Sequence, residues 1–285
     1  MYEYIFLFVV SIIWLVFASV QDLRTKEVSN WLNFSLVGLG LAYRLFYSVQ
    51  NKDYGFFVWG VFAVIIFFGI SQVFYYGRVF GGGDAKLLVG IVSFLPFSNF
   101  NEFVFQGGVF LLVLFSVGAI CSLVTSFIFA YRNKRKFYIM FSKINKEFNW
   151  KFYISLFIVV LLILGKGYDW FIGSIFFILM LFVSYLLIYL HAVDKSCMLV
   201  YVKPRDLREG DWIGEEITIK GRKIGASVHG LSFFEINKLI KRGKKVLIKQ
   251  GVPFIPVFLF SYIIMLFFFF YDIQLQALFL QIFQF

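Results

Sequence analysis

The chain has 285 residues, of which 61% are hydrophobic and only 15% are charged. A soluble globular protein is closer to half apolar and one quarter charged, so this composition excludes an ordinary soluble enzyme and predicts a membrane protein. The net charge of +11 would also suit a nucleic-acid-binding protein, but Lys and Arg mark the cytoplasmic loops of membrane proteins in the same way. We therefore expect a lipid bilayer, and no nucleic acid, among its partners.

Apolar runs along the chain predict about eight transmembrane helices. They cover residues 4–20, 31–49, 54–76, 85–100, 103–131, 148–164, 170–191 and 253–271. One sizeable polar stretch interrupts them after the seventh run. The predicted fold class is therefore an all-α polytopic membrane protein with a small α+β cytoplasmic insertion.

The basic residues predict the orientation of these helices. Four stretches, residues 21–30, 77–86, 132–151 and 193–252, hold 24 of the 27 Lys and Arg residues. With eight spans, all four stretches fall on one side, which the positive-inside rule assigns to the cytoplasm. The remaining three basic residues, Arg44, Lys52 and Lys166, are then assigned to the outer side. We expect a multi-pass protein of the plasma membrane with both termini outside.

The stretch from residue 132 to residue 150 mixes basic residues with Phe, Tyr, Ile and Met. This composition fits a helix lying along the inner leaflet, and it fits an ordinary basic loop equally well.

The polar insertion contains its own secondary-structure signals. Strands are predicted at 198–202, at 217–219 with Ile224, and at 246–248. Ser232 and Glu235 have the spacing of a capping box, so a helix is expected to begin there and to end near Gly243. The predicted domains are a membrane domain at 1–192 with about seven transmembrane helices, a cytoplasmic module at 193–252, and a final helix with an outer tail at 253–285.

Two acidic residues stand out by their position. Asp22 follows the cytoplasmic end of the first span, and Asp84 precedes the fourth span on the same side. Ionisable residues near the bilayer are costly and are therefore candidates for function. Because span ends at a common depth can meet in a helix bundle, the two carboxylates are predicted to share one site.

Two adjacent carboxylates suit aspartic proteolysis, because together they hold one proton. The ionised carboxylate takes a proton from water, and the protonated one donates to the carbonyl oxygen. The helix ends predict that Asp22 holds the shared proton and that Asp84 is the base. The glycines before Asp84, including Gly81 and Gly83, are expected to let another backbone approach closely and to allow unusual backbone angles. Lys86 is assigned either to the electrostatics of the site or to a headgroup anchor.

The string from Gly81 to Lys86, GGGDAK, resembles the GxGD signature of membrane aspartyl peptidases, in the form found in prepilin and preflagellin peptidases. The string from Asp22 to Asn30, DLRTKEVSN, resembles the segment that carries their first catalytic Asp. That segment ends in an apolar-Pro-Asn triplet in the family, whereas this chain has Val28-Ser29-Asn30 without the proline. The polar stretch from Asp206 to Pro256 is similar to the C-terminal part of archaeal members.

The resemblance implies an aspartic-type endopeptidase with Asp22 and Asp84 as its catalytic pair. Its substrates would be type IV pilin-like or archaellin precursors, which lose a short basic leader at the cytoplasmic face. The cysteine-rich region that accompanies methyltransferase activity in bacterial prepilin peptidases has no counterpart before the first span. The resemblance is therefore to the archaeal type, for which no methyltransferase activity and no cofactor are expected.

An acidic cluster in the polar stretch is a candidate site for the basic leader. Its members are Asp206, Glu209, Asp211, Glu215 and Glu216. Their negative charge would attract Lys and Arg of a leader, or it would simply balance nearby basic residues in a solvated loop.

Other functions remain open at this stage. His191 and His229 have no acidic or cysteine neighbours at metal-binding spacing, and Cys121 and Cys197 form no CxxC pair, so no metal site is predicted. A presenilin-like intramembrane protease would place its first Asp deeper in a span. An ion transporter, or a non-enzymatic anchor for a pilus machine, is a further alternative.

Overall fold

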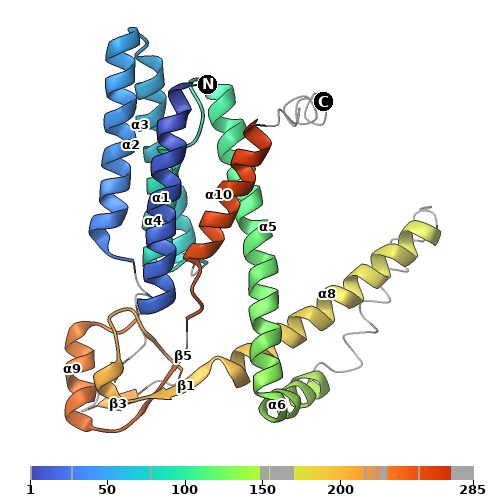
Figure 1. Ribbon diagram of the computed structural model, residues 1–285. Helices are drawn as coiled ribbons and strands as arrows, with labels where there is room; N and C mark the ends of the chain where they lie inside the picture. The colour runs from blue at the N-terminus through green and yellow to red at the C-terminus, as the bar shows by residue number, and fades with distance from the viewer. Residues whose placement is uncertain are drawn as a thin grey trace. The chain divides into compact units, whose positions relative to one another are not determined.

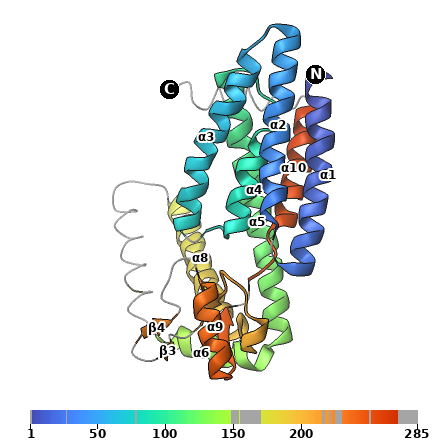
Figure 2. The ribbon, with the colours of Figure 1, turned by 90° about the vertical axis from the view of Figure 1, so that its left-hand side faces the viewer.

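The computed structural model describes residues 2–26, 28–77, 79–147, 154, 170–214, 217–219, 222–224, 230–249 and 251–270. The chain forms two compact units, one made of Met1–Cys121 with Val252–Phe285 and the other of Ser122–Gly251. This division differs from the predicted domains, because the helix at 170–197 belongs to the second unit. Figures 1 and 2 show the elements in two views.

The first unit is a helical bundle built by apolar segments of the chain. Its helices are α1 (Tyr2–Thr25), α2 (Asn30–Asn51), α3 (Gly55–Tyr76), α4 (Gly82–Val92) and α10 (Ile255–Phe270), together with the first part of α5 (Phe100–Arg132). Helix α10, the last element of the chain that the structure describes, packs along α1, the first (Figure 2). The bundle therefore joins segments from both ends of the chain.

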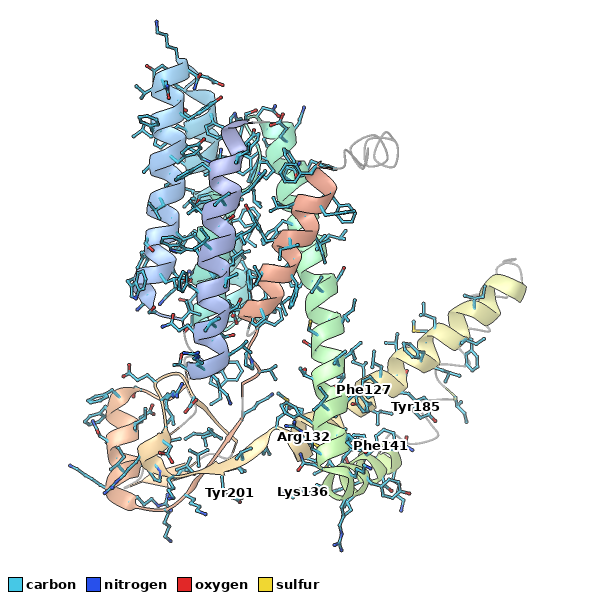
Figure 3. All side chains as sticks on the ribbon, in the orientation of Figure 1. Phe127, Arg132, Lys136, Phe141, Tyr185 and Tyr201 are labelled. Atoms are coloured by element: carbon cyan, nitrogen blue, oxygen red, sulfur yellow. The ribbon has the colours of Figure 1, made fainter. Side chains whose placement is uncertain are left out.

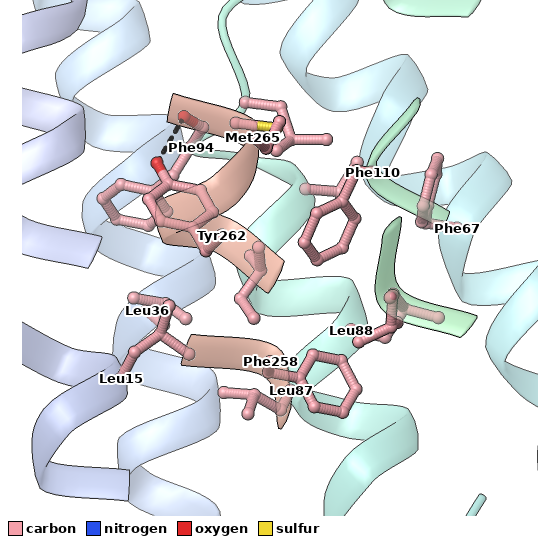
Figure 4. Close-up of a cluster of buried hydrophobic side chains, with 14 of the residues drawn as sticks. Leu15, Leu36, Phe67, Leu87, Leu88, Phe94, Phe110, Phe258, Tyr262 and Met265 are labelled. Carbon is pink, nitrogen blue, oxygen red and sulfur yellow. Dashed lines mark hydrogen bonds between the residues drawn. The ribbon is translucent and has the colours of Figure 1, made fainter. Parts of the chain in front are cut away.

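The core of this unit is almost entirely apolar. Figure 4 shows Leu15, Leu36, Leu87 and Phe258 within it, contributed by four different helices. Helices α2 and α4 approach closely at Gly90, where a β-carbon would lie 2.8 Å from a methyl group of Leu36. Small residues allow such close helix packing in membranes, where apolar burial alone gives little drive for association.

Within the part of the chain that the structure describes, five helices are long and apolar enough to cross a membrane. They cover Tyr4–Thr25, Asn30–Asn51, Gly55–Tyr76, Phe100–Arg132 and Phe177–Cys197. These correspond to five of the predicted spans, so the chain is a multi-pass membrane protein. Helix α10 is a shorter apolar helix of 16 residues. The predicted span at 148–164 lies, apart from Ile154, outside the described residues.

The predicted span at 85–100 is not a full transmembrane helix. Helix α4 has only 11 residues and ends at Val92, whereas a straight helix needs about 20 residues to cross a bilayer. The chain then turns several times, with Phe94, Leu95 and Phe97 completely buried, before α5 begins at Phe100. The prediction was wrong because an apolar run indicates burial and says nothing of where a helix stops.

The second unit contains α6 (Lys134–Glu147), α8 (Trp170–Cys197) and α9 (Phe233–Arg242) with two small sheets. The strands β1 (Leu199–Val202), β5 (Val246–Lys249) and β2 (Trp212–Ile213) form an antiparallel sheet in the order β1-β5-β2. The strands β3 (Ile217–Ile219) and β4 (Arg222–Ile224) form a hairpin, and Pro204–Asp206 forms a single 3₁₀ turn.

Helix α9 has the ends that the sequence predicts. Ser232 and Glu235 form the reciprocal capping box, and Gly243 ends the helix in the left-handed conformation with φ of 69°. Its apolar side, Ile236 and Leu239, packs into a small core with Leu231 and Val246. The cytoplasmic placement of this polar segment remains a prediction.

Candidate functional site

Asp22 lies inside the last turn of α1, which continues to Thr25. The prediction ended the first span at residue 20 and placed Asp22 just past it, so the predicted end of this helix was about one turn too early. Its side chain is only 6% exposed, and Oδ2 accepts a hydrogen bond of 3.1 Å from the backbone N–H of Ile255. Ile255 is the first residue of α10, and the first N–H groups of a helix have no partner within it. Asp22 therefore joins the end of α1 to the beginning of α10.

Asp84 lies in the first turn of α4, where its half-buried carboxylate accepts a hydrogen bond from a preceding backbone group. The donor is the N–H of Gly81, the residue before the helix, at 3.1 Å from Oδ2. A carboxylate in this position stabilises a helix start, because it satisfies a donor that the helix leaves unpaired. The contact also fixes the side chain at the open end of α4.

The glycines before Asp84 provide space, but they do not adopt unusual backbone angles. Gly81 is in the extended region, with φ of −69° and ψ of 165°, and the positive-φ glycines among the described residues are all in the second unit. The conformational freedom that glycine allows is therefore not used at Gly81. A β-carbon at Gly81 would lie 3.2 Å from Oδ2 of Asp84, and one at Gly83 would meet nothing within 4 Å. The surface beside Asp84 is therefore open on the Gly83 side.

Asp22 and Asp84 are close enough to influence each other electrostatically. Burial raises the pKa of the Asp84 carboxyl to about 7; the hydrogen bond from Gly81 opposes this rise, and the negative charge of Asp22 adds to it. A carboxyl with a raised pKa beside an ionised one is the arrangement expected of an acid and base pair. The raised pKa favours Asp84 as the protonated partner, opposite to the prediction from the helix ends. A helix terminus shifts the pKa of a carboxyl group less than burial combined with a nearby like charge does.

Hydrogen bonds hold the segment between α1 and α2 beside these carboxylates. Lys86 Nζ donates to Oδ1 of Asn30 at 2.7 Å, which ties the first turn of α2 to α4. Gln21 Oε1 accepts hydrogen bonds from the backbone N–H and the hydroxyl of Ser29, at 3.3 and 3.1 Å. Ser29 stands where the family motif has proline, and its side chain makes a contact that proline lacks. Sequence reasoning singled out Lys86 but did not find its partner.

The burial of Arg44 was not predicted from the sequence. Arg44 was assigned to the outer side as a topological charge, but it lies within α2, in the half nearer Asn51, and is completely buried. Its guanidinium donates to the carbonyl oxygens of Ser93 at 2.8 Å, Phe97 at 3.0 Å and Phe56 at 3.1 Å, and also to Leu95. An ionisable residue within an apolar run was the available signal, since such residues persist only where they are paired.

The contacts of Arg44 explain why α4 can stop inside the bundle. Backbone that leaves a helix within the membrane must still satisfy its carbonyl groups. Arg44 from α2 and the hydroxyl of Tyr262 from α10 supply the donors, the latter to the carbonyl of Phe94 at 3.2 Å (Figure 4). Helix α4 is thus held at its last residues by α2 and α10, and its first turn presents Asp84.

The candidate leader-binding residues lie in the second unit. Asp206 and Glu209 are exposed, whereas Asp211 is half-buried and accepts a hydrogen bond of 2.8 Å from the backbone N–H of Arg208. Glu215 and Glu216 lie outside the described residues. The described part of the chain contains no group of three or more His, Cys, Asp or Glu side chains that could hold a metal ion.

Membrane-length helices, together with two carboxylates that are close enough to interact electrostatically, describe a multi-pass membrane protein with a pair of interacting acidic side chains. Residues 9–130, which include both carboxylates, match the type IV leader peptidase family. The match covers less than half of the 285 residues of the chain.

Two curated relatives align with a shorter segment. The chain is 30% identical over 92 residues to a preflagellin peptidase of Methanocaldococcus jannaschii and 26% identical over 89 residues to one of Methanococcus maripaludis. These alignments cover 32% and 31% of this chain. They span 39% and 38% of the two relatives, less than half of each.

Proposed function

We propose that this chain is an aspartic-type membrane endopeptidase that removes the short basic leader from type IV pilin-like or archaellin precursors. The reaction takes place at the cytoplasmic face of the plasma membrane, and Asp22 and Asp84 are the catalytic pair. The observation that carries this proposal is the electrostatic coupling of the two carboxylates within the segment that matches the leader peptidase family. The preflagellin peptidase relatives support the substrate class.

The chemistry needs one protonated and one ionised carboxyl group. The ionised group removes a proton from water as the water oxygen attacks the scissile carbonyl carbon, and the protonated group donates to the carbonyl oxygen. Collapse of the tetrahedral intermediate breaks the C–N bond, and the leaving nitrogen takes a proton from the pair. The products are a new carboxyl terminus and a new amino terminus, and one water is consumed.

The proton assignment follows the environments of the two groups. Asp84, with its pKa near 7, is the proton donor to the carbonyl oxygen. Asp22 is then the base, and its carboxylate accepts a backbone hydrogen bond from Ile255 as that of Asp84 does from Gly81. No cofactor, metal or methyltransferase function is part of this proposal. The open surface at Gly83 leaves room for an extended substrate beside Asp84.

The acidic residues of the second unit are proposed to bind the leader. Asp206 and Glu209 are exposed, whereas the carboxylate of Asp211 accepts a backbone hydrogen bond. Asp206 and Glu209 are therefore the best positions to test. Replacing both by Lys should raise KM for a basic-leader precursor. It should leave kcat nearly unchanged, because the basic residues of the leader do not take part in breaking the scissile bond. Asp53→Lys, at an exposed position of the first unit, is the matched control. An unchanged KM would remove these residues from the proposal.

The test of the catalytic pair is precursor cleavage in membranes by the wild type, Asp22→Asn and Asp84→Asn. Each single change should slow cleavage by about a hundredfold to ten-thousandfold, because each removes one acid or base function. Asp53→Asn is the control and should cleave at the wild-type rate. If either site variant accumulates normally and still cleaves, that carboxyl is structural. The ion-transport and anchor alternatives would then need to be tested directly by ion flux and by binding to a pilus machine.

A further inference from the structure

Helix α6 begins almost directly where a membrane-length helix ends. Helix α5 runs to Arg132, and α6 starts at Lys134 after a single intervening residue, Asn133. Figure 3 shows Arg132 and Lys136 at this junction and Phe141 farther along α6. Because α5 is long and apolar enough to cross the membrane, its continuity with α6 holds α6 near a membrane surface.

One side of α6 is already used for packing within the protein. Ile144 is buried in a cluster with Ile188 and Ala192 of α8. The ring of Phe137 meets the ring of Tyr189, also in α8, edge to face at 5.4 Å between centroids. These contacts lie in the last turns of α8, which is also a membrane-length helix. The apolar side of α6 therefore rests on protein and is not free to insert into lipid.

The other side of α6 is exposed and strongly basic. We call it the α6 basic face, and define it by Arg132, Lys134, Arg135, Lys136, Lys143 and Lys146. The single acidic residue between 131 and 147 is Glu147. Tyr138 and Ile139, which are 72% and 63% exposed, lie among these charges. The first four of these cations have no acidic residue within four positions along the chain, whereas Glu147 lies four residues after Lys143.

Exposed aromatic residues indicate how deep the junction of α5 and α6 lies in the membrane. Tyr131 at the end of α5 is 71% exposed and lies under Lys134, whose Nζ is 3.9 Å from the ring centre. Tyr185 of α8 is 47% exposed (Figure 3). Exposed Tyr side chains gather where hydrocarbon gives way to headgroups. Tyr131 and Lys134 therefore indicate that the end of α5 and the start of α6 lie in the headgroup region.

From this arrangement we propose that the α6 basic face is a docking surface for the headgroups of anionic lipids, with Tyr138 and Ile139 entering the interface between them. Negatively charged headgroups complement the six cations, and α5 and α8 hold these cations at the right depth. A soluble polyanion fits the charge but not the two exposed apolar side chains. The proposal concerns lipid binding alone and does not depend on peptidase activity.

The test measures binding of phosphatidylglycerol and of phosphatidylcholine to the full-length protein in neutral detergent, by native mass spectrometry. We expect selective binding of phosphatidylglycerol that weakens as salt rises. The triple change Lys134→Gln, Arg135→Gln, Lys136→Gln should weaken it by roughly tenfold or more, since each cation near an anionic surface contributes about a fivefold change in affinity. The matched control, Lys241→Gln with Arg242→Gln and Lys244→Gln, removes three exposed cations from α9 and its flank, and should bind as the wild type does.

A conservative variant separates charge from folding. Lys134→Arg with Lys136→Arg keeps the charge and should retain selective binding, whereas equal loss in this variant and in the triple variant would overturn the proposal. Equal binding of both lipids by the wild type would also overturn it. So would an oligonucleotide that binds the wild type and is lost from the triple variant while phosphatidylglycerol binding stays unchanged.

Discussion

The carboxylate of Asp22 accepts a hydrogen bond from the backbone N–H of Ile255, which joins the end of α1 to the start of α10. Burial raises the pKa of Asp84 at the start of α4, and the charge of the same Asp22 carboxylate adds to this rise. One side chain thus takes part both in closing the bundle and in the proposed chemistry. The two roles can be separated by substitution, because an amide retains the hydrogen-bond acceptor and loses the negative charge.

Asp22→Ala should destabilise the protein more than Asp22→Asn. Alanine leaves the N–H of Ile255 without its acceptor in a buried site, which costs about 1–3 kcal/mol of the free energy of unfolding. Asparagine keeps a carbonyl oxygen at the same place. Thermal unfolding of the two variants in detergent measures the difference, and equal midpoints would show that this hydrogen bond contributes nothing to stability.

Cleavage should fall as the pH rises above about 7. Asp84 has its pKa raised to about 7, so it is mainly protonated below that pH and loses the proton above it. Because the proposed mechanism needs this proton, kcat/KM should decrease about tenfold for each pH unit well above the pKa. The same measurement on Asp53→Asn should give an identical alkaline limb. A profile that stays flat or increases between pH 7 and 9 would contradict the assignment of Asp84 as the acid.

Arg44→Leu should be strongly destabilising, because Arg44 is completely buried and donates hydrogen bonds to backbone carbonyl groups. It removes the donors to the carbonyl groups of Ser93, Leu95, Phe97 and Phe56 and leaves them buried without partners. Since each such group costs about 1–3 kcal/mol, we expect a loss of about 3 kcal/mol or more in unfolding experiments.

Two further variants test the interpretation of Arg44. Arg44→Lys keeps the charge but not the planar arrangement of donors, so it should recover only part of the loss. Lys52→Leu, at the exposed end of the same helix, should change stability by less than about 0.5 kcal/mol. A similar effect of Arg44→Leu and Lys52→Leu would show that the carbonyl contacts are not important.

Lys86→Met and Asn30→Ala should each slow cleavage and have little effect on stability. Both residues are exposed, so loss of their hydrogen bond costs at most about 1 kcal/mol in folding. The bond ties α2 to the turn of α4 that carries Asp84, so its loss should misplace that carboxyl and reduce kcat by roughly tenfold. The double variant should be no slower than the slower single variant. Independent, multiplicative effects would indicate that the two residues do not act together.

Much of the long-helix architecture could be predicted from the sequence. Apolar runs found the five helices that are long enough to cross a membrane, because burial in lipid requires such runs. The capping box at Ser232 and the glycine stop at Gly243 were also predicted correctly, since both depend on residues only a few positions apart. Helix ends that depend on neighbouring residues can therefore be predicted from short stretches of sequence.

The features that the sequence did not predict depend on contacts between distant segments. The end of α4 at Val92 is stabilised by Arg44, which lies 49 positions before Ser93, and Asp22 meets Ile255 at a separation of 233 positions. Neither contact can be predicted from the spacing of apolar residues or from the spacing of motifs. The raised pKa of Asp84 was not predicted for a related reason: helix ends could be located from the sequence, but the burial of Asp84 and its proximity to Asp22 arise only in the folded bundle.

The contact between α1 and α10 has a consequence for biosynthesis. A ribosome makes Asp22 and Asp84 early, while the residue that donates to Asp22 belongs to the last helix described. During synthesis both carboxylates therefore reach the membrane long before their site is complete. A chain that terminates before α10 carries the full family-matching segment and still lacks the backbone donor that orients its first aspartate. The order of translation thus delays a fully assembled site until α10 has been made.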